Sequence, residues 1–136
     1  MALLLAGGLA ACCSSCRPRG AATHLPGTVL EVSDSSILSL RRDTFDLGRL
    51  REGERIVKEF SVKNSGSVPF VVSSAESDCG CIVSEYDRRP VAPGEYALLG
   101  VSFDSRGYRG YLLKRVALTT TLRREPLVFY LEAVIE

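Results

Sequence analysis

Apolar side chains recur at every second position in many short runs, which constrains the fold more than any other feature of the chain. In one such run, Phe60 and Val62 alternate with polar neighbours. A period of two places apolar side chains on one face of an extended segment, whereas a helix needs spacings of three and four. No segment sustains the helical spacing, so we expect helices to be short or absent. The alternating apolar positions are Phe45, Leu47, Phe60, Val62, Val68, Phe70, Val72, Leu99, Val101, Phe103, Val116, Leu118, Phe129, Leu131, Ala133 and Ile135.

Turn-forming residues separate these runs. Gly48 ends the first run, Asn64-Ser65-Gly66-Ser67 follows another, and polar clusters containing glycine lie at 87–94 and 105–110. Gly, Pro, Asn, Asp and Ser are the residues that tight turns prefer. Lys58 falls on the apolar face of its run, so we expect a bulge or a strand end there. About seven short strands in roughly 100 residues predict an all-β fold, a two-sheet sandwich.

The length and charge of the chain limit the number of domains and the classes of partner that we expect. We expect one folded domain over residues 37–136, which is long enough for a single core. The chain carries 17 Lys and Arg against 16 Asp and Glu, for a net charge of +1. Basic and acidic residues stand side by side, as in Arg51-Glu52, which is typical of a solvated surface. This balance provides no field for a polyanion, so we expect no nucleic-acid partner.

The first residues look like a bacterial lipoprotein signal. A short apolar run at 2–9 leads into Leu9-Ala10-Ala11-Cys12, and small residues before a cysteine resemble a lipobox. The run is about half of the roughly 20 residues that a membrane-spanning helix needs. The resemblance implies a signal peptide over residues 1–11, cleavage before Cys12 and lipidation of its thiol. We therefore expect a cell-envelope protein that Cys12 anchors to a bacterial membrane, facing the periplasm.

Residues 12–36 are predicted to form a flexible tether between the membrane and the domain. The segment is small and polar and is interrupted by prolines and glycines, with a weak signal for one short strand at 29–32. Cys13 and Cys16 have the C-x-x-C spacing of thioredoxin-like centres. Such a centre needs the N-terminus of a helix in a βαβ unit, which this segment does not offer.

Short motifs occur along the domain in a characteristic order. They are Phe45-Asp46-Leu47-Gly48, Phe60, Asn64-Ser65-Gly66, Pro69-Phe70, Cys79-Gly80-Cys81, Pro93-Gly94 and Val101-Ser102-Phe103-Asp104. The ordered set, which extends from Phe45 to Ile135, resembles the bacterial domain-of-unknown-function family 1573. The resemblance implies an immunoglobulin-like sandwich, related in architecture to abnormal-spindle and major-sperm-protein domains. It also implies a secreted protein or lipoprotein, with no settled activity.

The Cys79-Gly80-Cys81 motif carries the most specific chemistry of the domain. In an extended segment, residues two apart face the same side, so both sulfurs can meet or converge on one ion. A disulfide needs the chain to curl until the Cα atoms lie within about 6.8 Å, which Gly80 permits. Cu(I) suits two soft thiolates, whereas zinc needs four ligands. The sequence leaves four interpretations of Cys79 and Cys81 open: buried structural thiols, a local disulfide, a copper site or a redox centre.

We expect no catalytic residues and no cofactor. The one His, His24, lies in the tether, so the domain lacks an imidazole for a Ser/His/Asp or Cys/His arrangement. No glycine-rich loop opens a helix, which argues against a phosphate-binding loop. The sequence predicts a non-enzymatic, lipid-anchored envelope domain that presents a binding surface for a protein or ligand, with an envelope protein as its partner. The alternative is a copper-handling module that uses Cys79 and Cys81.

Overall fold

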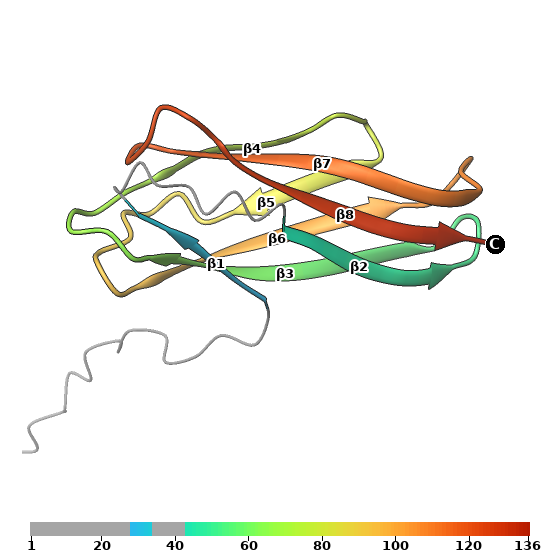
Figure 1. The fold of residues 1–136 in the computed structure, drawn as a ribbon, viewed down its shortest axis with the longest axis horizontal. Coiled ribbons are helices and arrows are strands. Elements are labelled where there is room, and N and C mark those ends of the chain that lie inside the picture. The colour runs from blue at the N-terminus through green and yellow to red at the C-terminus, as the bar shows by residue number, and fades with distance from the viewer. Residues whose placement is uncertain (1–27, 34–42) are drawn as a thin grey trace, which may run out of the picture.

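The computed structural model describes residues 28–33 and 43–136, and every regular element within them is a strand. The strands are β1 (Thr28–Val32), β2 (Asp43–Leu50), β3 (Arg55–Asn64), β4 (Val72–Ser77), β5 (Ile82–Tyr86), β6 (Tyr96–Asp104), β7 (Gly110–Thr120) and β8 (Leu127–Ile135). Sheet A has the order β1-β3-β6-β5, and sheet B has the order β2-β8-β7-β4. The two sheets enclose one core (Figure 1), which confirms the expected all-β sandwich.

An aromatic cluster lies in the core between the two sheets. Phe45, Phe60 and Phe129 come from β2, β3 and β8, and their ring centroids lie 5.0 to 5.8 Å apart. The rings meet edge to face or tilted, the arrangements that aromatic quadrupoles favour. Both sheets therefore depend on the same three side chains.

The predicted strand phase is confirmed. Phe60, Val101 and Leu131 are each at most 2% exposed, although they belong to three different strands. Glu59, the neighbour of Phe60, is exposed on the opposite side of β3. The alternation of two thus separates core from solvent, as a half-buried strand requires.

β3 continues through Lys58 without the bulge or strand end expected there. Its register with β6 is unbroken from Arg55, opposite Asp104, to Lys63, opposite Tyr96. Lys58 is half-buried on the inner side. A lysine can lay its aliphatic stem on an apolar surface while its ammonium stays in water. The prediction was wrong because this single lysine is accommodated without breaking the ladder.

The alternation at 68–72 does not form a strand over its whole length. Pro69 has no N–H for a ladder, and Phe70 makes only an isolated bridge to Val91. β4 begins after this point, at Val72. β5 has no counterpart among the predicted runs, because Ile82 is its one buried aliphatic side chain.

β1 lies in sheet A, although its residues fall within the expected tether at 12–36. It pairs in parallel with the 60–64 segment of β3, and Leu30 and Val32 are buried. The sandwich therefore begins before residue 37, because an edge strand with two buried side chains gives only a weak sequence signal. No helix long and apolar enough to span a membrane occurs within 28–33 and 43–136. The residues of the expected signal and tether that lie outside the described ranges include Cys12, Cys13, Cys16 and His24.

β2 pairs in parallel with β8, from Asp43 opposite Phe129 to Leu50 opposite Ile135. The register shifts between Asp46 and Arg49. At this shift Gly48 has a φ of 85°, and its N–H donates to the Asp46 carboxylate at 2.6 Å. A positive φ of this kind favours glycine, so Gly48 sets the bend in β2.

Candidate functional site

The Cys79–Cys81 corner connects the two sheets where β4 ends and β5 begins. Cys79 and Cys81 are joined by a disulfide across Gly80, and their Cα atoms lie 5.3 Å apart. Of the alternatives that the sequence left open, the structure has the local disulfide. Both cysteines are half-buried and pack against the core. The corner therefore contains a covalent bond between residues that are already neighbours along the chain.

Hydrogen bonds hold the backbone on both sides of the disulfide. The Ser77 hydroxyl donates to the Cys79 carbonyl at 2.7 Å, and the Asp104 N–H donates to the Cys81 carbonyl at 2.9 Å. Gly80 is exposed, and no heavy atom outside its chain neighbours lies within 4 Å of the position that a Cβ would take. The corner is thus fixed from inside and open toward solvent at Gly80.

Donor groups for a metal are sparse around the corner. Glu76 and Asp78 are exposed beside the cysteines. Within the described residues, no group of three or more His, Cys, Asp or Glu side chains is placed to hold a metal ion. The sulfurs are bonded to each other, so they are not present as the thiolates that Cu(I) prefers.

Asn64 organises the opposite end of the sandwich, a role that the sequence indicated only as a turn. Its side chain is buried, and Nδ2 donates to the carbonyls of Val68 and Val91, both at 2.8 Å. Its Oδ1 accepts from the Gly66 N–H at 2.9 Å. The Asn-x-Gly spacing was the available signal, because an Asn side chain commonly bonds the backbone two residues on. Asn64 is therefore a structural residue.

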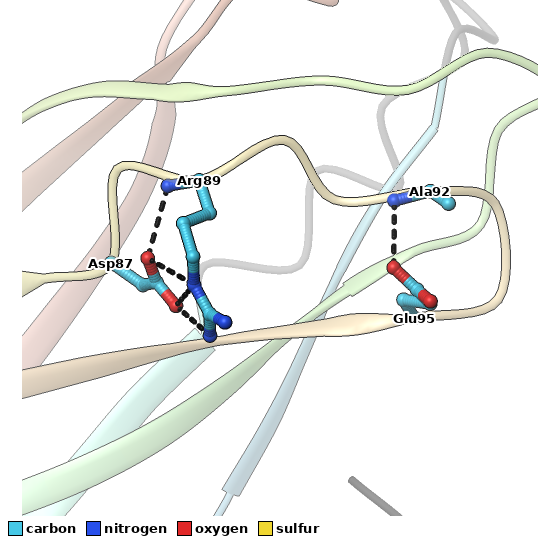
Figure 2. Close-up of polar contacts among 4 residues, drawn as sticks. All are labelled: Asp87, Arg89, Ala92 and Glu95. Atoms are coloured by element: carbon cyan, nitrogen blue, oxygen red, sulfur yellow. Dashed lines mark hydrogen bonds and ion pairs between the residues drawn. The ribbon is translucent and has the colours of Figure 1, made fainter. Parts of the chain in front are cut away.

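The loop between β5 and β6 is held by its own carboxylates, as Figure 2 shows. Asp87 accepts from the Arg89 N–H at 2.9 Å and from the Arg89 Nε at 2.8 Å. The hydrogen bonds from Arg89 lower the pKa of Asp87, and the same pairing raises the pKa of Arg89. Glu95 accepts from the Ala92 N–H at 3.2 Å. These contacts fix a loop and leave no carboxylate pair free for acid–base chemistry there.

Three rows of side chains cross the outer face of sheet A, which we define as the side of β1, β3, β6 and β5 turned away from the core. The strand registers align these rows from β1 or β3 to β6 or β5. The first and third rows present exposed aliphatic residues. The central row has a glutamate on each side of a glycine. The rows are Val29–Ser61–Leu98, Glu59–Gly100–Glu85 and Val57–Ser102–Val83.

Exposure and charge distinguish the central row from its surroundings. Val57 is 61% exposed and Val83 58%, and Val29 and Leu98 are exposed at the two ends of the first row, although Ser61 between them is buried. Beyond them, acids on the same face are paired: Glu31 with Lys63 at 3.7 Å and Asp104 with Arg55 at 3.0 Å. No ion pair within the described part of the chain involves the two carboxylates of the central row. The face thus combines accessible apolar rows with uncompensated negative charge.

The outer face of sheet B differs in its polar contacts. Tyr111 and Leu113 of β7 are exposed there. The Tyr111 hydroxyl donates to the Glu132 carboxylate at 2.9 Å, which raises the pKa of Tyr111. Leu113 lies opposite Glu132 in the register. This face therefore places its exposed apolar residues beside a carboxylate that already has a partner.

Comparison with known proteins identifies a family and supports the fold. The family model described as "Protein of unknown function (DUF1573)" matches residues 38–135. No curated protein matches the sequence.

Two solved structures share the fold. A protein of unknown function from Porphyromonas gingivalis W83 has a TM-score of 0.58 and 18% identity, over 67% of this chain and 43% of that chain. The secreted serine protease VesC from Vibrio cholerae has a TM-score of 0.50 and 12% identity, over 66% of this chain and 21% of that chain. The chain thus spans less than half the length of either protein. At these identities, the likeness shows the fold alone.

Proposed function

The chain belongs to the DUF1573 family of proteins of unknown function, and we propose that it is a lipid-anchored, non-enzymatic domain of the cell envelope that binds a partner protein. The outer face of sheet A is the binding surface. The observation that carries this proposal is the unpaired Glu59–Gly100–Glu85 row between two exposed aliphatic rows. The lipobox-like Leu9-Ala10-Ala11-Cys12 supports the anchor.

The arrangement of the rows defines the chemistry of the partner. Gly100 has no side chain, so an incoming side chain can approach the backbone of the sheet between Glu59 and Glu85. A Lys or Arg placed there faces a carboxylate on each side. Apolar residues on either side of that cation pack on Val57 with Val83 and on Val29 with Leu98. A buried apolar contact around a desolvated charge pair is the pattern that gives both affinity and specificity at interfaces.

The paired charges at the ends of the face support the same partner. Glu31 with Lys63 and Asp104 with Arg55 neutralise each other, so the field of the face is concentrated in its centre. Charge complementarity therefore favours a partner with one basic group between apolar residues over a broadly basic surface such as a polycation. The alternative function, copper handling through the reduced Cys79 and Cys81, has only these two sulfurs to draw on, because no group of three or more metal-binding side chains occurs within the described residues.

Charge reversal on the two faces tests the binding surface. A photo-crosslinking residue at position 83, in the full chain in its native envelope, should give a discrete crosslinked product. Glu59→Lys with Glu85→Lys should abolish that product, whereas Glu76→Lys on the outer face of sheet B should leave it intact. The crosslinked partner peptide should contain a Lys or Arg between apolar residues. A product that survives the double reversal, or no product at position 83, contradicts the proposal.

The anchor is tested separately. Cys12→Ala should leave the chain unlabelled by radioactive palmitate and remove it from the membrane fraction, because the acylated thiol is gone. The acyl chains of the wild type bind membrane with about 0.8 kcal/mol per buried methylene, so its retention should be firm. Label that persists in the variant, or a soluble wild type, contradicts the lipoprotein assignment.

A further inference from the structure

We infer that Cys79 and Cys81 form a redox-active pair that exchanges two electrons with a protein dithiol, rather than a structural cross-link. The inference is independent of the binding surface proposed above. It rests on three features of the Cys79–Cys81 corner: the separation of two residues, the hydrogen bonds that flank the disulfide, and the open side at Gly80.

The first step concerns how much folding stability this disulfide can provide. A cross-link stabilises a fold mainly by restricting the unfolded chain, and the effect grows with the length of the closed loop. Cys79 and Cys81 are two residues apart. The chain-entropy relation then gives about a 15-fold gain in the folding equilibrium constant, against about 3,000-fold for a loop of 100 residues. The Cys79–Cys81 disulfide therefore contributes little to folding stability.

The second step follows from thermodynamic linkage. Folding and disulfide reduction form one thermodynamic cycle. If the disulfide raises the folding equilibrium constant by some factor, folding therefore lowers the equilibrium constant for reduction by the same factor. The native disulfide is thus only about 15-fold harder to reduce than the same disulfide in the unfolded chain. The fold does not lock this pair in the oxidised state, unlike the long-range disulfides of secreted domains.

The third step concerns the reduced form. The strands on both sides keep their own partners, with Ser77 opposite Val116 and Ile82 opposite Phe103. The hydrogen bonds to the carbonyls of Cys79 and Cys81 do not involve the sulfurs. The corner therefore stays folded when the S–S bond opens, so the oxidised and reduced forms are two states of one native structure.

The surroundings select the reacting partner. Both cysteines are half-buried beside an exposed glycine, and Gly80 is the side from which we infer that a thiolate approaches the disulfide. Glu76 and Asp78 are exposed next to them in the sequence, and no ion pair within the described residues neutralises either. This charge repels anionic thiols such as glutathione and favours a protein dithiol in a basic setting.

The exchange balances without any further reactant. One thiolate of the partner attacks a sulfur of the pair, the S–S bond breaks, and the leaving sulfur takes up a proton. The second thiolate of the partner then attacks the mixed disulfide and releases the other cysteine, which is also protonated. The pair gains two electrons and two protons, and the partner dithiol becomes a disulfide.

A redox titration of the full chain in glutathione buffers tests the inference. Free thiols are trapped by alkylation, and cleavage after Lys63 and Arg88 isolates the segment that contains Cys79 and Cys81 apart from Cys12, Cys13 and Cys16. The reduction constants in native buffer and in urea should agree within about 15-fold. Circular dichroism of the reduced chain should match that of the oxidised chain. Native protection above 100-fold, or unfolding on reduction, overturns the inference.

The class of partner is tested by the charge of the reductant. A cationic thiol such as cysteamine should reduce the pair faster than glutathione, by a factor that shrinks with added salt. Asp78→Asn with Glu76→Gln should also shrink that factor, whereas Glu95→Gln, an exposed acid at the opposite end of the sandwich, should not. If the variant leaves the ratio of the two rates unchanged, the acidic residues do not select the partner and that assignment falls.

Discussion

The two ends of the sandwich are held in opposite ways. At the end where β6 begins, Asn64 uses hydrogen bonds that reach as far as Val91, 27 residues away. At the end where β6 stops, Cys79 and Cys81 share a covalent bond that reaches two residues. In Figure 1 the β3–β4 and β4–β5 connections mark these two ends. The stronger bond therefore spans the shorter stretch of chain.

The comparison teaches that sequence separation and burial, rather than bond strength, decide what constrains a fold. The buried amide of Asn64 bonds two backbone carbonyls from a loop and a later strand connection, so its loss removes hydrogen bonds that tie distant segments together. The Cys79–Cys81 disulfide joins residues that neighbouring strands already position. We expect mutation at the Asn64 end to lower the free energy of unfolding more than mutation at the Cys79–Cys81 corner.

A core variant sets the scale for this comparison. Phe60→Ala removes one ring of the Phe45–Phe60–Phe129 cluster and should lower the free energy of unfolding by about 3–5 kcal/mol. Glu59→Ala, on the solvent side of the same strand, should stay within about 0.5 kcal/mol. Denaturant melts measure both. Equal losses from the two variants contradict the assigned strand phase.

Asn64→Ala should rank second. It removes the hydrogen bonds to the carbonyls of Val68 and Val91 and from the Gly66 N–H, although the Val91 carbonyl keeps the Phe70 N–H as a partner, and the loss should be about 1–3 kcal/mol. Ser65→Ala is the matched control, because its exposed side chain is in the same turn. Urea melts of the two variants measure the difference. A loss for Asn64→Ala no larger than for Ser65→Ala reverses the interpretation of this end.

The double variant Cys79→Ser, Cys81→Ser should cost less than Asn64→Ala. The short loop limits the loss to less than about 2 kcal/mol on the chain-entropy relation. The same melt, with a reduced wild-type sample as control, measures it. If the free energy of unfolding falls by as much as is expected for Phe60→Ala, the disulfide is a major source of folding stability and the comparison is wrong.

The Asp87–Arg89 pair adds a short-range noncovalent case, with the smallest expected effect. The pKa of Asp87 is lowered by hydrogen bonds from Arg89, so this stabilisation is present above the unfolded-state pKa and is lost as pH falls through the folded pKa. Arg89→Ala should raise the Asp87 pKa toward its ordinary value in an NMR titration. Arg88→Ala is the control, because its side chain contacts Tyr86. An unchanged Asp87 pKa in Arg89→Ala contradicts the assignment.

The fold was predictable where burial alternates along one strand. Phe60, Val101 and Leu131 carry that signal in the sequence, and the structure buries all three. β5 was not predictable in this way, because only Ile82 among its residues is a buried aliphatic side chain. Lys58 misled the pattern, since its long stem accommodates half-burial without breaking the ladder.

The candidate sites were predictable to different degrees. Cys79 and Cys81 stand out because their spacing is local and their chemistry is rare in the chain. The Glu59–Gly100–Glu85 row could not be found from the sequence, because it exists only when β3 and β5 pair with β6 from opposite sides. Non-local pairing registers are not encoded in any single segment, so a site built across strands needs the structure.

The parallel pairing of β2 with β8 has a consequence for the timing of folding. Sheet A has all its strands once Asp104 has been synthesised. β2 begins at Asp43, but its partner strand β8 becomes available only when synthesis has passed Phe129, which pairs with Asp43. At about 5–20 residues per second, synthesis of the intervening chain takes roughly 4–17 s. During that delay Phe45 has no β8 to pack against, and the aromatic cluster is incomplete. For seconds, therefore, the nascent chain has β2 as an unpaired strand with an apolar face, the kind of segment that is prone to pair with other chains.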